Sequence, residues 1–203
     1  MWSGREHVRN EGALRKSQFI NRHPAVNIHH ARRYSEREGI PFNWFVTINF
    51  GLAGVPPESA SHFLQKLLAQ RFAPWLRRSP ANDNNLRPTY AWSLEAPYGT
   101  VSGHLLMHLP PKLANAFRAH LRFWLEGLAG AAIPAHAIDM RPVYNPIGAT
   151  RYILKGIAPT WAAHLAVDPV SQGKIVGKRT GFSRNLGPAA RRRKGYKPQR
   201  HRG

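Results

Sequence analysis

The chain has 203 residues, with 30 Lys and Arg against 10 Asp and Glu, and a formal net charge of +20 at pH 7. It contains no Cys, which excludes disulfides and Cys-bound zinc. No apolar run approaches the roughly 20 residues that a membrane-spanning helix needs. We therefore expect a cytoplasmic protein without a membrane partner.

Most of the excess positive charge lies towards the two ends of the sequence. Residues 171–203 hold 11 basic side chains and no acid, and residues 1–40 hold 8 basic and 4 acidic ones. Lys and Arg that displace counterions from phosphates gain affinity without special geometry. The composition therefore predicts a nucleic-acid binder. A merely solvated basic surface and an anionic membrane surface are the alternatives.

Residues 1–39 show no sustained apolar period, which predicts a basic, mostly flexible N-terminal arm with at most a short helix around residues 28–37. The pattern changes at residue 41, where apolar and polar residues alternate as in a strand with one buried face. The apolar members of that strand are Phe42, Trp44, Val46, Ile48 and Phe50.

Further elements follow in order. Apolar spacings of three and four predict helices over residues 58–78 and 110–128. Residues 90–95 and 101–109 alternate as two strands joined by a short turn, which is typical of an antiparallel hairpin. A fourth strand is expected over 137–144 and a third helix over 147–157.

This order of elements predicts an α+β fold, an antiparallel β-sheet with helices packed on it as a sandwich. The folded core is expected over residues 40–160. Residues 161–203 are expected to form a Gly-rich, Arg- and Lys-rich C-terminal tail, so that basic extensions flank the core.

The hairpin carries two candidate metal ligands. Glu95 and His104 fall on the polar faces of adjacent strands, and a carboxylate with an imidazole suits Mg²⁺ or Mn²⁺. The alternative is a structural histidine on a half-buried strand. His108 lies four residues from His104, about 13 Å along a regular strand, which is too far to share a metal with it.

The third helix carries a candidate nucleophile. Tyr152 and Lys155 are three residues apart and therefore neighbours, with Arg151 on the same side. An ammonium beside a phenol favours the phenolate and can also hold a phosphate. An ordinary tyrosine on a basic helix face is the alternative.

The ordered set of motifs resembles the HUH endonucleases, the family of rolling-circle replication initiators, relaxases and single-tyrosine transposases. The set comprises the first strand with Thr47, the strands with Glu95 and His104, and the helix with Tyr152 and Lys155. The resemblance covers residues 42–157, and each motif alone is short.

The resemblance implies a reaction on single-stranded or origin DNA of a mobile element. Tyr152 would attack a phosphodiester and give a 5′-phosphotyrosine and a free 3′-OH, so that the strand can be rejoined later. Glu95 and His104 would hold a divalent cation, Mg²⁺ or Mn²⁺, and Lys155 would assist the phenolate. Host replication proteins would be further partners.

One residue departs from the family pattern, because Ser102 stands where the first of two paired histidines is expected. Three outcomes are open. In the first, the metal binds through Glu95, His104 and water. In the second, a bulge at Gly103 brings in His108, and in the third the site is degenerate.

Nucleic-acid contacts are expected from several polar and basic residues. Thr47 and Asn49 of the first strand and Arg151 of the third helix belong to this group. In the tail, the Gly-rich stretch offers Lys178, Arg179 and Arg184 to phosphates, and Phe182 to a base. Residues 189–194 are expected to be an unstructured cationic arm. The arm's basic residues are Arg191, Arg192, Arg193 and Lys194.

Two other functions stay open at the level of sequence. One is a non-enzymatic nucleic-acid-binding module that uses the same sheet. The other is a basic protein associated with RNA or the ribosome. The DNA sequence recognised and the oligomeric state are not encoded in any motif, because phosphate contacts carry no sequence information.

Overall fold

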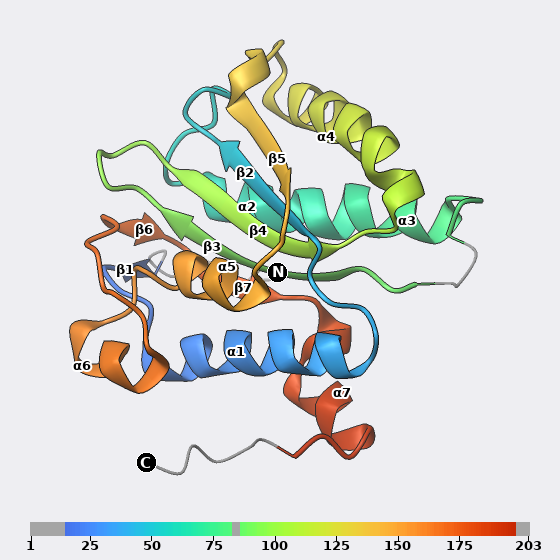
Figure 1. Cartoon of the computed structure of the whole chain (residues 1–203). Helices are drawn as coiled ribbons and strands as arrows, with labels where there is room; N and C mark the ends of the chain where they lie inside the picture. Colours follow the sequence, from blue (N-terminus) through green and yellow to red (C-terminus); the bar gives the residue numbers. More distant parts are fainter. Residues whose placement is uncertain (1–14, 83–85, 198–203) are drawn as a thin grey trace, which may run out of the picture.

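The computed structural model describes residues 15–82 and 86–197. Its centre is a five-stranded antiparallel sheet in the order β5-β2-β4-β3-β7, with helices on both faces (Figure 1). The strands are β2 (Trp44–Asn49), β3 (Thr89–Glu95), β4 (Ser102–His108), β5 (Ile138–Pro142) and β7 (Thr180–Phe182). A separate pair is formed by β1 (Lys16–Ser17) and β6 (Ile175–Val176). The predicted α+β fold is confirmed.

Three helical segments connect β2 to β3, and one connects β4 to β5. The first group runs without a break from α2 (Ala60–Lys66) through a π-helical stretch (Leu67–Phe72) into α3 (Ala73–Arg78). The second is α4 (Ala114–Ala129), which follows a 3₁₀ turn (Pro111–Leu113). Both groups cover one face of the sheet, as the apolar spacings predicted.

The face under α2, α3 and α4 is purely apolar. Alternate residues of the strands point into it, and the side chains there are buried together with those of the helices. The strand residues in this cluster include Val46, Ile48, Trp92, Leu94, Leu105 and Met107.

The opposite face is covered by α1 (Arg22–Arg37) and α5 (Pro146–Ile153), below the sheet in Figure 1. Its apolar cluster includes Ala91 and Leu106 from the strands and Ile28 and Ile153 from the helices. Short helices α6 (Pro159–Ala162) and α7 (Pro188–Arg193) lie on this side, along with 3₁₀ turns at Ala163–Leu165 and Arg184–Leu186. A third 3₁₀ turn, Ala135–Ala137, precedes β5.

The prediction of a mostly flexible N-terminal arm is wrong for the described residues from 15 onward. Helix α1 spans 16 residues and buries Ala25, Ile28 and Ala31 against the sheet. The sequence pattern of α1 gives a weak apolar period, because two of these residues are small and because polar Arg32 and Ser35 share the buried side. Residues 1–14 lie outside the described part of the chain.

The prediction of an independent C-terminal tail also fails. Strand β7 pairs with β3 and completes the sheet, and Gly181 is needed there because a Cβ would lie 2.6 Å from the Trp92 ring. The expected unstructured arm at 189–194 is largely the helix α7, which begins with Pro188 at its first position. Tyr196 then packs on Tyr34 of α1, with ring centroids 5.4 Å apart.

The third helix is shorter than predicted. Helix α5 ends at Ile153 rather than at 157, because the amides of Leu154, Lys155 and Ile157 bond to carbonyls three residues back and form turns. Ile147, near the start of the helix, is 49% exposed. Lys155 still lies beside Tyr152, since its amide donates to the Tyr152 carbonyl at 3.1 Å.

No helix within residues 15–82 and 86–197 is long and apolar enough to cross a membrane.

Candidate active site

His104 stands in the middle of the sheet, on the face covered by α5. It lies on the central strand β4, opposite Thr47 of β2 and Ser93 of β3, and is only 4% exposed. The Thr47 hydroxyl lies 3.1 Å from His104 Nδ1 and hydrogen bonds with it. This bond fixes the imidazole ring and leaves Nε2 on the side of β3.

Glu95 meets His104 from the neighbouring strand. It is the last residue of β3, and its Oε1 lies 2.8 Å from His104 Nε2. The other oxygen, Oε2, forms an ion pair with Lys155 Nζ at 2.8 Å. One carboxylate therefore joins the imidazole of β4 to the ammonium that follows α5.

The charges of this cluster support one another. Burial alone would raise the pKa of the Glu95 carboxyl, but interactions with His104 and Lys155 outweigh burial and lower that pKa. Burial would likewise lower the pKa of Lys155, but Glu95 and Tyr152 hold that pKa above its ordinary value. Glu95 is thus kept anionic and Lys155 cationic near neutral pH.

Tyr152 forms the outer part of the cluster. Its ring packs edge-on against His104 and Phe45, with centroid distances of 5.3 and 5.6 Å, and Lys155 Nζ lies 4.1 Å from its centroid. The side chain is nevertheless 46% exposed. The phenol is therefore positioned by three neighbours and open to a ligand from solvent.

The cluster offers two donors to a divalent cation, His104 Nε2 and a carboxylate oxygen of Glu95. His104 Nε2 is buried and lies 2.8 Å from Glu95 Oε1. A nitrogen and a carboxylate oxygen that converge in this way fit a cation whose remaining ligands are water and phosphate oxygens. Among the described residues, however, no group of three or more His, Asp or Glu side chains is arranged for a metal.

Ser102, which stands in place of an expected histidine, is directly opposite Glu95 on β3 and Asn49 on β2. It lies two residues from His104 on the same face of β4, as strand alternation requires. A longer side chain at position 102 would therefore start beside the Glu95 carboxylate. Whether the residue at 102 belongs to the site stays a prediction.

His108 does not join the cluster. Strand β4 pairs regularly with β2 from Ser102 to Met107 and with β3 from Ser102 to His108, so that no bulge forms at Gly103. A Cβ at Gly103 would lie 2.9 Å from the Phe50 ring, which accounts for the glycine by close packing. His108 Nδ1 instead contacts the Pro41 carbonyl at 2.7 Å, and the prediction of His108 as a metal ligand is wrong.

Several residues expected to bind nucleic acid have structural partners within the fold. Asn49 accepts a hydrogen bond from the Leu52 amide and closes the turn after β2. Arg179 is 5% exposed and donates to the carbonyls of Gln18 and Gly173. Arg191 is 6% exposed and donates to Asn27 of α1. Burial of Arg179 and Arg191 makes them parts of the fold rather than members of mobile arms.

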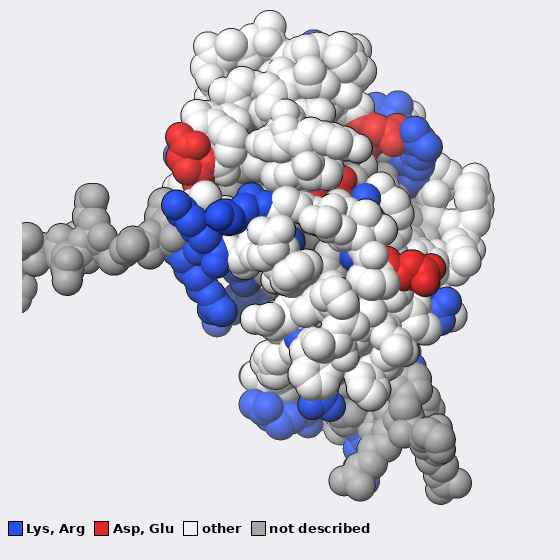
Figure 2. Space-filling model, turned by 90° about the vertical axis from the view of Figure 1, so that its left-hand side faces the viewer, with Lys and Arg blue, Asp and Glu red and all other residues white. Residues whose placement is uncertain are grey.

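The other basic candidates are at the surface. Arg151, Lys178, Arg184 and the residues Arg192, Arg193 and Lys194 are exposed, and Phe182 is half-buried. Figure 2 shows Lys and Arg side chains gathered in patches near the margins of one face, with a largely uncharged surface between them. Sequence reasoning missed Phe45, which packs on both His104 and Tyr152; its place on the first strand beside Thr47 was the available signal.

Comparison with protein-family models, curated proteins and solved structures finds no match for this chain. The class of protein therefore rests on the fold and on the cluster of Glu95, His104, Tyr152 and Lys155. Membership of the HUH endonucleases stays a prediction.

Proposed function

We propose that this protein binds single-stranded DNA and cleaves and rejoins it through Tyr152, in the manner of a replication initiator or relaxase. The observation that carries the proposal is the placement of Tyr152. It is a half-exposed phenol in contact with His104 and Lys155, and both of these contact the Glu95 carboxylate.

The geometry supports a definite role for each side chain. The Tyr152 oxygen would attack the phosphorus, and the 3′ oxygen would leave and take up a proton, while the phenolic proton is lost to solvent. Lys155 would stabilise the phenolate and the charge that develops on the phosphate. Thr47 would hold the His104 ring in place through Nδ1.

A divalent cation held by Glu95 and His104 would polarise the phosphodiester. Because the described residues bring only two such donors together, phosphate oxygens and water would complete the coordination, as is common for Mg²⁺. Affinity for the cation in the absence of DNA is expected to be low.

The test is covalent trapping. Single-stranded oligonucleotides of varied sequence are incubated with the full chain and Mn²⁺, and adducts that survive denaturing electrophoresis are counted. The native chain should form an adduct and Tyr152→Phe should form none. Tyr144→Phe is the matched control, because Tyr144 is 90% exposed and lies just before α5. Adduct formation by Tyr152→Phe would show that Tyr152 is not the nucleophile.

Binding without cleavage is a second candidate function, favoured by the two-donor site and by Ser102. It predicts salt-sensitive DNA binding with no adduct under any metal. Ser102→His separates the two, because a second imidazole beside Glu95 would increase nicking by a weakened enzyme. A preference for RNA at fixed salt would instead favour the RNA-associated role, since only RNA offers the 2′-OH.

A further inference from the structure

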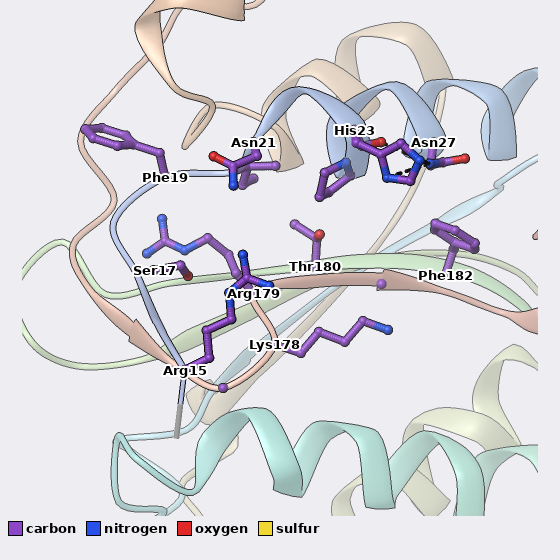
Figure 3. Close-up of a pocket in the computed structure, with 14 residues that line it drawn as sticks. Arg15, Ser17, Phe19, Asn21, His23, Asn27, Lys178, Arg179, Thr180 and Phe182 are labelled. Carbon is purple, nitrogen blue, oxygen red and sulfur yellow. Dashed lines mark hydrogen bonds between the residues drawn. The ribbon is translucent and has the colours of Figure 1, made fainter. Parts of the chain in front are cut away.

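A second concave site lies at the edge of the sheet, between the start of α1 and strand β7 (Figure 3). It encloses about 330 Å³, which is near the lower end of the range for small-molecule sites. The side chains used below are Arg15, Ser17, Phe19, Lys178, Arg179 and Phe182. We call this site the edge pocket.

The edge pocket is built by segments that are far apart in sequence. Strand β1 pairs with β6, and the Gly177 amide donates to the Arg15 carbonyl at 2.7 Å. Gly177 has φ +85° and turns the chain between β6 and β7, so that Arg15 and Lys178 are brought to the same pocket. The pairing of β1 with β6 thus brings together basic residues that are far apart in the sequence.

Two polar atoms in the wall of the edge pocket are unpaired. Arg179 is 5% exposed, and its Nε has no hydrogen-bond partner within residues 15–82 and 86–197, although both terminal nitrogens are used. The buried Ser17 hydroxyl is likewise without a partner in the described chain. Buried donors left unpaired are unfavourable, so that a ligand with acceptor oxygens would be stabilised here.

The positive charge of the edge pocket favours an anionic ligand. Arg15 and Lys178 are exposed cations, and no Asp or Glu of the described residues lines the pocket. Burial lowers the pKa of Arg179 to about 10, which still leaves it charged at neutral pH. The N-terminal end of the 16-residue helix α1 also reaches the pocket at Asn21 and adds positive potential.

The ends of the edge pocket are aromatic. Figure 3 shows Phe19 at one end and Phe182 at the other, with the basic groups between them. Phe19 is 38% exposed and Phe182 is half-buried, so that each ring offers surface to a ligand. Aromatic rings of this kind stack on nucleobases irrespective of sequence.

We propose that the edge pocket binds one nucleotide unit, with its phosphate on Arg15, Ser17 and Arg179 and its base against Phe19. In the protein's function this unit belongs to the single strand that reaches Tyr152. The inference rests on the proposed binding of single-stranded DNA. The edge pocket shares no residue with the cluster around Tyr152, so that variants of Phe19 and Arg15 leave the catalytic side chains in place.

The experiment titrates the full chain with deoxyadenosine 5′-monophosphate, inorganic phosphate and deoxyadenosine separately, using calorimetry. The nucleotide should bind at least tenfold more tightly than either part, because the pocket offers both a cationic and an aromatic surface. Phosphate that binds as tightly as the nucleotide would show an anion site only and overturn the proposal. Absence of nucleotide binding would do the same.

Variants assign the binding to the edge pocket. Phe19→Ala should weaken nucleotide binding about tenfold, since stacking on one aromatic ring contributes roughly that much. Arg15→Gln should also weaken it, because it removes a cation proposed to contact the phosphate. The controls are Phe123→Ala, which removes a ring that is 70% exposed on α4, and Arg71→Gln on the far side of the sheet. Equal losses in the variants and their controls would contradict the proposal.

A second experiment tests whether the edge pocket binds part of a DNA strand. A fluorescent single-stranded oligonucleotide is bound to Tyr152→Phe, with and without Phe19→Ala, at fixed salt. Weaker binding in the double variant supports the strand as the natural source of the nucleotide. If the mononucleotide binds but the oligonucleotide does not, the pocket serves a free nucleotide and the proposed DNA function fails. If Tyr152→Phe forms adduct but nucleotide binding is intact, only the catalytic assignment is lost.

Discussion

The two faces of the sheet are built from the same strands but differ in chemistry. The face under α2, α3 and α4 receives the apolar members of the alternation, such as Leu105 and Met107. The face under α1 and α5 receives Thr47, Glu95 and His104, and all three have polar partners there. One face is therefore an apolar core, and the other combines a second apolar cluster with polar groups that lie where the covering helix leaves Tyr152 exposed.

The largest expected effect is on the apolar face. Leu105 is 2% exposed, and Leu105→Ala should reduce the free energy of unfolding by about 2–5 kcal/mol, because it leaves a cavity in a packed core. Urea denaturation followed by circular dichroism measures this. Adduct formation by the fraction that stays folded should be close to native, because His104 points to the opposite face.

The control for this comparison is Leu52→Ala. Leu52 is 40% exposed in the turn after β2, and its truncation should change the free energy of unfolding by less than about 0.5 kcal/mol. A loss of adduct per folded molecule in Leu105→Ala would mean that the two faces are coupled, which contradicts the separation drawn above.

The next effect is on the polar face. Glu95→Gln removes the charge that pairs with Lys155 and holds its pKa high, and it also weakens the cation site. Adduct formation should slow by about a hundredfold, comparable to removal of one electrostatic contact at a transition state. The rate of adduct formation at several Mn²⁺ concentrations measures this.

Glu58→Gln is the matched control for Glu95→Gln, because Glu58 is exposed before α2. It removes the same charge from the chain and should leave the rate unchanged. If both variants lose activity equally, net charge rather than the cluster controls the rate.

The smallest effect is a pH dependence of stability that comes from the α1 side of the polar face. Burial and nearby arginines, including Arg32 and Arg151, lower the pKa of His29 from 6.5 to about 4. His29 is therefore neutral in the folded protein, and the stability it contributes is present above pH 6.5. That stability is lost as the pH falls towards 4, because the unfolded chain takes up the proton first.

Unfolding measured at pH 7 and pH 5 checks this prediction. His29→Leu should lose less stability between the two pH values than the native chain does. His62→Leu, which changes an exposed histidine of α2, should behave as the native chain does. An unchanged pH dependence in His29→Leu would show that other groups cause it.

Local pattern predicted most of the sheet and its covering helices. The alternation that placed Glu95 and His104 on polar faces of adjacent strands is the same alternation that brings them within 2.8 Å. Likewise, the spacing of Tyr152 and Lys155 predicted their contact, although α5 ends before Lys155. These features depend on residues a few positions apart or on strands joined by a short turn.

Pairing between the ends of the chain escaped prediction. Arg179 and Arg191 looked like members of cationic arms, yet Arg179 donates to Gln18, 161 residues away in sequence, and Arg191 to Asn27, 164 residues away. The edge pocket was missed for the same reason, since Phe19 and Phe182 belong to opposite ends. Periodicity carries no information on which distant segment supplies the partner.

The sequence by itself determined a basic α+β protein whose hairpin and third helix carry Glu95, His104, Tyr152 and Lys155, because strand and helix periods are local properties of the backbone. Tertiary structure decided that α1 and β7 belong to the core and that His108 is excluded from the cluster. It also decided that cations from both ends meet at one pocket. These outcomes depend on which segments bury each other's apolar surface and satisfy each other's backbone hydrogen bonds, and that choice involves the whole chain.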